Sequence, residues 1–171
     1  RPANRGLGAF LVAEYGDGKA RALKARAFHL AALQIYEAEG AELDIARSLV
    51  AIGETYETMM DEPGQAERYF SEASAAFERL GGPEHPGVAL SATLLGMHYT
   101  YSDRLDAAQT QLERARAILT ASGNSGHRNF ALNLNGLATL HLKRGDPAAA
   151  EPLLRQAAEI HRAKEGPTHI N

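Results

Sequence analysis

The sequence predicts an all-α protein that folds as a right-handed superhelical solenoid of about four antiparallel helix hairpins. Three observations predict this fold class. The sequence repeats itself with a period of about 42 residues. Within each repeat, apolar residues recur every three or four positions, which is the period of an α-helix and not of a β-strand. Glycines and prolines stand where helices are expected to end and begin.

Three independent series of residues carry the period. One is a histidine that precedes a helix pair, one is an apolar residue in the first helix, and one is an alanine in the second helix. The series are His85, His127 and His169; Ile52, Leu95 and Leu137; and Ala66, Ala108 and Ala150. Their steps are 42 residues, except for one step of 43 between Ile52 and Leu95. Because different residue types agree on one period, we interpret the chain as a tandem repeat.

The first forty residues fit the repeat less well. Leu7-Gly8 and Leu11 are similar to the first helix of the later units, so we expect helices over 3–15 and 18–38 with a turn between them. The second helix can be aligned on Ala20 and Ala27 or on Ala25 and Ala32, and the sequence does not decide between these registers. Residues 1–40 are therefore predicted to form a degenerate N-terminal hairpin.

Three clear repeats follow, over residues 41–82, 83–124 and 125–166. Pro86 and the pair Asp146-Pro147 mark helix starts, because proline suits the first helical position and an aspartate before it can cap. Glycines such as Gly81 and Gly123 mark helix ends. The expected helices are 42–60 and 63–80, then 86–102 and 104–121, then 128–144 and 147–165.

Two further features concern the last repeat. Pro152 lies inside the final helix, where a missing amide hydrogen predicts a mild bend. Residues 167–171 repeat the start of an inter-unit linker, so we expect them to begin a further linker or repeat of one continuous solenoid domain. The final helix is expected to expose Leu153, Ala157 and Ile160 for end-to-end contact with a further repeat, domain or subunit.

Composition disfavours several classes of function. The 171 residues carry 18 Lys and Arg against 21 Asp and Glu, so neither a nucleic acid nor an anionic membrane is an expected partner. The absence of cysteine excludes disulfides and thiolate chemistry and fits a cytoplasmic location. Apolar stretches are too short to span a bilayer. Since the chain lacks an initiator Met, we expect it to be a segment of a larger protein.

The seven histidines do not predict an enzyme. The histidines of the 42-residue series recur because the linker recurs, and each is expected to cap or pack at the start of the next helix. His98 and His141 lie beside or at a position that otherwise holds tyrosine. The segment Gly16-Asp17-Gly18-Lys19 lacks the spacing of a phosphate loop and is better interpreted as a turn. We therefore expect no catalytic residue, no cofactor and no metal.

The repeated residues resemble a known family. Ile52-Gly53 with Tyr56, and Ala66 with Phe70, resemble the L-G-x-x-Y and A-x-x-x-F signature of the tetratricopeptide repeat. The longer period, together with the Gly-Pro-x-His-Pro linker, is similar to the kinesin-light-chain type of this repeat. The resemblance covers residues 41–171. Repeats of this type also occur attached to bacterial kinases and signalling ATPases.

The signature also has a steric interpretation. Small residues in the first helix are expected to lie opposite small residues in the second, so that the two backbones approach closely, while larger side chains fill the space beside them. The opposed pairs are Gly53 and Ala66, Gly96 and Ala108, and Ala138 and Ala150; the fillers include Tyr56, Tyr99, Phe70, Leu112 and Leu154.

The resemblance implies that the first helix of each unit lines a concave surface that binds a peptide or a partner helix. Asn135 is then expected to hydrogen-bond the ligand backbone, although an ordinary solvated asparagine is an equally good interpretation. Where one chaperone-binding subclass has Lys and Asn, this chain has Val50, Glu54 and Thr93, so a chaperone-tail receptor is disfavoured. The expected surface residues are Arg47, Val50, Ala51, Glu54, Thr58, Leu90, Thr93, Leu94, Met97, Tyr101, Leu132, Asn135, Gly136, Thr139 and Lys143.

Two functions follow as expectations. The first is a non-catalytic scaffold that binds a protein or an extended peptide, within a larger and possibly bacterial signalling protein. The alternative is a ligand-gated regulatory module that controls an attached kinase, ATPase or transcription factor. The two differ in whether ligand binding changes the curvature of the array.

Overall fold

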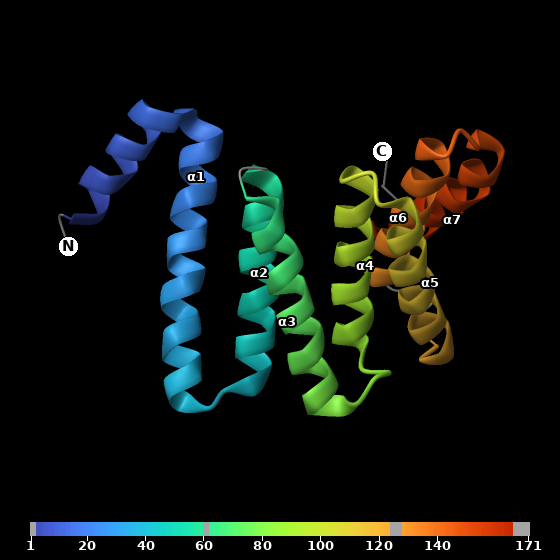
Figure 1. Ribbon diagram of the computed structural model, residues 1–171, viewed down its shortest axis with the longest axis horizontal. Helices are drawn as coiled ribbons and strands as arrows, with labels where there is room; N and C mark the ends of the chain where they lie inside the picture. The colour runs from blue at the N-terminus through green and yellow to red at the C-terminus, as the bar shows by residue number, and fades with distance from the viewer. Residues whose placement is uncertain (1–2, 60–61, 124–127, 166–171) are drawn as a thin grey trace, which may run out of the picture. The chain divides into compact units, whose positions relative to one another are not determined.

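In the computed structural model the chain is described over residues 3–59, 62–123 and 128–165. The surroundings of side chains are described for residues 18–59, 62, 64–123 and 128–163. Within these residues all regular secondary structure is α-helix, with short turns between the helices, as the sequence predicts (Figure 1). The seven helices of this part of the chain are α1 (Ala3–Glu39), α2 (Glu42–Met59), α3 (Pro63–Gly81), α4 (Pro86–Tyr101), α5 (Leu105–Ala121), α6 (Arg128–Lys143) and α7 (Pro147–Glu165).

From residue 42 onward, the helix ends differ from the predicted ones by no more than one residue. Prolines occupy the first position of α3, α4 and α7, where the missing amide hydrogen costs nothing because the first turn has no intrahelical acceptor for it. α7 continues through Pro152. None of the described helices is both long and apolar enough to cross a membrane.

The N-terminal region differs from the prediction. Instead of separate helices over 3–15 and 18–38, a single helix α1 runs from Ala3 to Glu39 and includes Gly16 and Gly18. A glycine inside a helix costs about 1 kcal/mol relative to alanine but does not by itself end the helix. In Figure 1 the ribbon of α1 nevertheless changes direction in its N-terminal part.

The chain divides into two compact units, residues Arg1–Ala76 and Phe77–Asn171. The boundary between these units lies inside α3. In the first unit, α1 packs against α2, and Tyr56 of α2 stacks on Tyr69 of α3 with ring centroids 5.5 Å apart. In the second unit, α4 pairs with α5, α6 pairs with α7, and α6 also contacts both α4 and α5.

The expected contact between small and large residues is present in both units. A Cβ atom added to Gly53 would lie 2.6 Å from Cε1 of Phe70. A Cβ atom added to Gly96 would lie 2.5 Å from Cγ of Leu112 and 3.2 Å from the carbonyl oxygen of Ala108. Neither glycine leaves room for a side chain. The expected approach of small residues is therefore confirmed for Gly96 and Ala108, whereas Gly53 lies against Phe70, one of the expected fillers.

His85 confirms the capping role expected for the recurring histidine. Its Nδ1 accepts a hydrogen bond from the backbone amide of Gly87 at 3.0 Å, which satisfies a free donor at the start of α4. The imidazole also stacks on the ring of Phe77, with centroids 5.3 Å apart and planes 15° apart. His127 and His169 lie outside the described residues.

Replacing His85 with alanine should lower the free energy of unfolding by about 1 kcal/mol or somewhat more, because the cap and the ring contact are lost together. His85→Asn keeps an acceptor that can cap, so it should lose less. Thermal melts of both variants would measure the difference. Equal losses would assign the effect to ring packing alone.

One expected filler, Leu154, is not buried. Its side chain is 43% exposed, whereas the equivalent Leu112 is fully buried. Leu112 lies between α4 and α6, because Cβ atoms added to Gly96 and to Gly136 would both contact it. Leu154 lacks such cover on its second side, since the described residues contain no helix after α7. The expected exposure of Ala157 was wrong: it is buried, and Leu153 and Ile160 are half-buried on the same stripe of α7.

Candidate functional site

In the first unit, α1 and α2 enclose an open groove of about 500 Å³. α2 contributes Ala51, Glu54 and Thr58, which the repeat position predicts to face a ligand. The helix α1 contributes residues that the sequence did not assign to a surface. They are Gly18, Arg21, Ala22, Ala25 and His29.

The two possible alignments of α1 differ in which alanines lie at the groove. Ala25 lines the groove opposite α2, and Ala32 is half-buried, whereas Ala27 is exposed. Ala20, of the other register, is only 3% exposed, so burial does not decide between the register based on Ala25 and Ala32 and the one based on Ala20 and Ala27. The sequence contained both, but nothing in it indicated which stripe faces the next helix.

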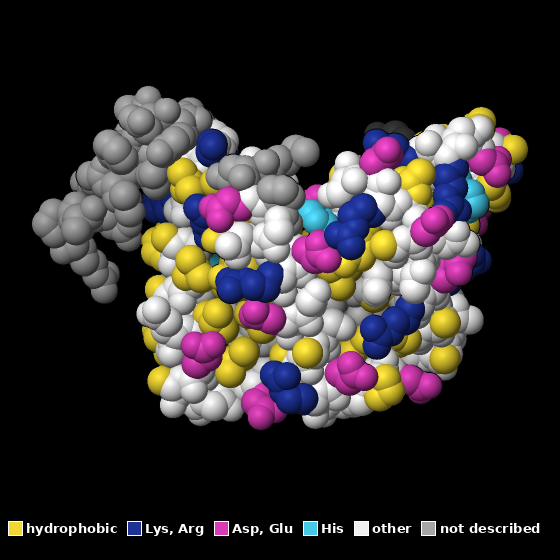
Figure 2. All heavy atoms as spheres, viewed as in Figure 1, with side chains coloured by type: hydrophobic (Ala, Val, Ile, Leu, Met, Phe, Trp, Pro, Cys, Tyr) yellow, Lys and Arg dark blue, Asp and Glu magenta, His cyan; other side chains and the backbone are white. Residues whose placement is uncertain are grey.

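Small side chains and mixed charge characterise this groove. The short side chains of Ala22, Ala25 and Ala51 line the groove, and Arg21 and Glu54 contribute charges of opposite sign. The hydroxyl of Thr58 donates to the carbonyl oxygen of Glu54 at 2.8 Å and is thereby satisfied within its own helix. On the face shown in Figure 2, positive and negative side chains are likewise interspersed. Such a surface suits local polar contacts more than long-range attraction of one charge sign.

In the second unit, most of the predicted residues form one accessible surface on α4 and α6. Their spacing of three or four residues places them on one face of each helix. A Cβ atom added to Gly136 would lie 3.1 Å from Cγ of Met97, so the two helices meet closely beneath this surface. We call it the α4–α6 surface; it consists of the half-buried Leu90, Leu94, Met97, Leu132, Asn135 and Thr139 and the exposed Tyr101 and Lys143.

Two of the predicted ligand contacts are wrong. Thr93 is fully buried, and its hydroxyl donates to the carbonyl oxygen of Ala89 at 2.9 Å. Val50, at the same repeat position, is also buried. This position of the first helix faces neighbouring helices, so neither side chain can reach a ligand. Arg47 is exposed and lies 3.5 Å from the carboxylate of Asp44.

The sequence singled out Asn135, whereas the structure gives the larger internal role to Asn133. The Asn133 side chain is fully buried, and its Nδ2 donates to the carbonyl oxygen of Leu112 at 2.9 Å and to Oγ1 of Thr93 at 3.3 Å. It thereby joins α6 to α5 and to α4. Its Oδ1 has no hydrogen-bond partner among the described residues.

A sequence signal for this buried position did exist. Ser48 and Ser91 occupy the same place in the two preceding repeats, and both are buried. A small polar residue therefore recurs where an apolar one would be expected. The recurrence identifies the position as an internal one, where hydrogen bonds are described for Asn133 but the hydroxyl of Ser91 has no partner among the described residues.

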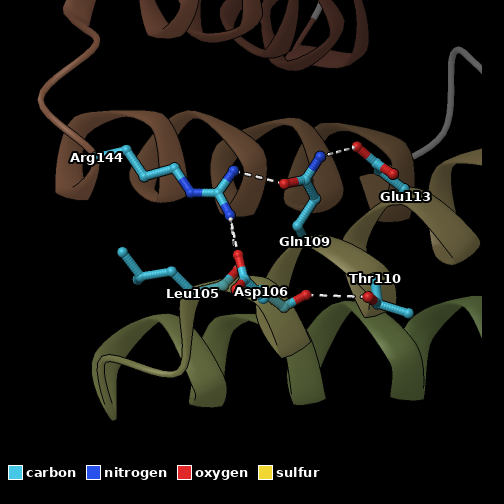
Figure 3. A network of polar contacts seen from close by, with 6 residues as sticks. All are labelled: Leu105, Asp106, Gln109, Thr110, Glu113 and Arg144. Atoms are coloured by element: carbon cyan, nitrogen blue, oxygen red, sulfur yellow. Dashed lines mark hydrogen bonds and ion pairs between the residues drawn. The ribbon is translucent and has the colours of Figure 1, made fainter.

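Arg144, just after α6, connects two turns of the second unit (Figure 3). Its guanidinium donates to Asp106 Oδ1 at 2.9 Å, to the side-chain oxygen of Gln109, and to the carbonyl oxygen of Leu105 at 3.4 Å. Nearby, Lys143 Nζ lies 4.0 Å from Oδ1 of Asp103. These pairs link the start of α5, and the turn before it, to the end of α6 and the turn after it.

Replacing Arg144 with alanine should lower the free energy of unfolding by about 1 kcal/mol, and the loss should shrink in 1 M salt because the pair is only partly shielded from solvent. Arg155→Ala is the matched control, since Arg155 makes a comparable contact with Glu151 at 2.7 Å within one exposed helix. The control should change stability by only a few tenths of a kcal/mol. Denaturant melts at low and high salt would test both expectations, and equal losses for the two variants would contradict them.

No group of His, Asp or Glu within the described ranges is arranged to hold a metal ion. Two family models, both described as tetratricopeptide repeat, match this chain, one over residues 45–121 and the other over residues 134–171. This chain is a tetratricopeptide repeat protein. Its repeat period of about 42 residues is longer than the usual 34 residues of this repeat.

Among solved structures, this tetratricopeptide repeat protein is similar to BtubC (BKLC) from P. vanneervenii. The sequences are 28% identical, and the TM-score is 0.68. The match covers 88% of this chain but 60% of the length of BtubC. No curated protein sequence matches the chain. Tetratricopeptide repeats are generally modules for protein–protein interaction and are typically non-catalytic.

Proposed function

We propose that this chain is a non-catalytic scaffold module that binds a protein or an extended peptide through the α4–α6 surface, as part of a larger cytoplasmic protein. The observation that carries the proposal is the row Leu90, Leu94, Met97 and Tyr101. These side chains remain partly or largely accessible although they belong to a helix that is otherwise almost entirely buried.

The chemistry of the surface favours a ligand with apolar side chains along an extended backbone. Leu94, Met97 and Tyr101 offer apolar contact area, and the tyrosine hydroxyl can remain in water. Asn135, half-buried beside them on α6, has an amide that can both donate to and accept from a peptide backbone. Its backbone oxygen already accepts from Thr139 Oγ1 at 2.9 Å, so the Thr139 hydroxyl is less available to a ligand.

A peptide selection with a built-in control tests this proposal. Peptides that bind the intact chain would first be selected from a random library. Their affinities would then be measured for the intact chain and for the variants Tyr101→Ala, Asn135→Ala and Leu142→Ala. Tyr101 and Leu142 are 52% and 51% exposed, but only Tyr101 belongs to the α4–α6 surface. We expect Tyr101→Ala to weaken binding about tenfold, as a central contact residue does, and Leu142→Ala to leave it unchanged. If Tyr101→Ala and Leu142→Ala lowered the peptide affinity equally, or if neither lowered it, the peptide would bind outside the α4–α6 surface.

The division of the chain into two compact units supports a second candidate function. In this alternative, a ligand changes the arrangement of the array and thereby regulates an attached kinase, ATPase or transcription factor. Small-angle X-ray scattering with and without a selected peptide separates the two candidates. An unchanged radius of gyration at saturation would count against the gated module.

A further inference from the structure

His85 joins the end of α3 to the start of α4 within the second unit. Its Nδ1 accepts from the amide of Gly87, and its ring stacks on Phe77. A Cβ atom added to Gly81 would lie 2.5 Å from Cδ2 of the imidazole, and one added to Gly87 would overlap the Phe77 ring. We call His85, Phe77, Gly81 and Gly87 the α3–α4 clasp.

The clasp differs in sequence from the corresponding linker one repeat later. At a distance of 42 residues, Leu119 stands in place of Phe77, and Asn129 stands in place of Gly87. The aromatic ring that stacks on the histidine, and the glycine that lets this ring approach, are therefore not repeated. The periodic histidine is shared by the linkers, whereas this ring contact belongs to His85.

The cap depends on an uncharged imidazole. An Nδ1 atom that accepts a hydrogen bond carries no hydrogen, so the one ring hydrogen of His85 lies on Nε2. A second proton can be added only at Nδ1, where it turns the acceptor into a donor that faces the amide of Gly87. The charged ring would also lie at the amino end of α4, where the helix dipole disfavours positive charge. Protonation therefore removes the cap.

The charged side chains near the clasp come from α3 and from the linker. They are Glu78 and Arg79 in the last turn of α3, and Glu84, which precedes His85 in the sequence. Glu78 Oε2 lies 4.0 Å from the guanidinium of Arg114 on α5. α4 contains no Asp, Glu, Lys or Arg, and no described residue forms an ion pair with His85. These charges therefore give the imidazolium no ion pair in exchange for the lost cap.

One contact of the clasp favours the charged ring. Phe77 is only 4% exposed, and the face of an aromatic ring attracts a cation. Two effects oppose this attraction, namely the loss of the cap and the position at the helix dipole. Since the three effects are of similar size, the two that oppose the charge outweigh the one that favours it.

We propose that the α3–α4 clasp is a pH-sensitive joint, which is closed while His85 is uncharged and is opened by proton uptake at Nδ1. The unfolded chain takes up this proton without losing a cap, so acid favours the unfolded state at this position. The stability that the clasp contributes is complete at about pH 8 and decreases toward about pH 5, the range in which histidine side chains change charge. The first turn of α4 is the part of the second unit that loosens.

Thermal melts of the intact chain and two variants at about pH 7.5 and about pH 5.5 test the joint. His85→Asn retains an acceptor for the Gly87 amide but takes up no proton, and His85→Ala has no acceptor. The remaining histidines are the same in all three chains, so their contribution cancels in the comparison. We expect acid to lower the melting temperature of the intact chain by about 2 °C more than that of either variant. If His85→Ala does not fold, the comparison with His85→Asn is sufficient.

Hydrogen exchange at the Gly87 amide measures the joint locally. Its protection factor, corrected for the effect of pH on the intrinsic exchange rate, should fall about threefold or more between the two pH values in the intact chain. It should stay constant in His85→Asn. The proposal would be overturned if acid lowered the melting temperature of the intact chain no more than that of His85→Asn, or if the protection of Gly87 did not change.

Discussion

Replacing Gly96 with leucine should lower the free energy of unfolding by about 3 kcal/mol, the upper end of what overpacking a core costs. The first added carbon would lie 2.5 Å from Cγ of Leu112 and 3.2 Å from a backbone oxygen of α5, so both a side chain and a helix must move. Leu112 cannot simply turn aside, because Gly136 of α6 closes its other side. A urea melt followed by circular dichroism would measure the loss.

Gly64→Leu is the matched control for this substitution. Gly64 lies in the first turn of α3, its φ is not positive, and a Cβ atom there would meet nothing within 4 Å. Its replacement should leave stability within about 0.5 kcal/mol of the original chain. If both variants lost the same amount, the close approach of α4 and α5 would not be the cause.

Replacing Asn133 with aspartate should cost about 3 kcal/mol at pH 7, because a carboxylate would be buried facing the carbonyl oxygen of Leu112. Aspartate at this position has no amide hydrogens to donate. Burial favours the protonated acid in the folded state, so the penalty relative to the original chain should be present at neutral pH and shrink as the pH falls toward about 4. Chemical melts at several pH values would follow this trend.

The control is two residues away. Asn135→Asp makes the same chemical change at a half-buried position on the α4–α6 surface and should cost less than about 1 kcal/mol, with little dependence on pH. Similar penalties at the two positions would mean that Asn133 is not the internal connection between α4, α5 and α6.

The helices from residue 42 onward were predictable because each repeat provides an alignment for the others. One proline or glycine is weak evidence of a helix end, but Gly81 and Gly123, which both mark helix ends, stand 42 residues apart, one full period. The close contact at Gly96 followed for the same reason. Residues 1–40 have no such support, and there the sequence predicted a turn at Gly16-Asp17-Gly18 where the structure has continuous helix.

The candidate surface was less predictable than the fold. Thr93 and Leu94 are adjacent in sequence, yet one is fully buried and the other is half-buried, because consecutive helical residues point about 100° apart. Polar residues that face inward interrupt the apolar pattern from which orientation is inferred. The amide nitrogen of Asn133 donates to the hydroxyl oxygen of Thr93, so both polar side chains lie in the interior although their polarity alone would suggest the surface.

The links made by Asn133 and Arg144 have a consequence for how the second unit opens. They join the α4–α5 and α6–α7 hairpins at two separate places, one buried and one near the surface. Amide protons in the middle of α5 and α6 should therefore exchange with deuterium at the same rate, as members of one cooperative block, whereas those of α7 beyond Leu154 should exchange sooner.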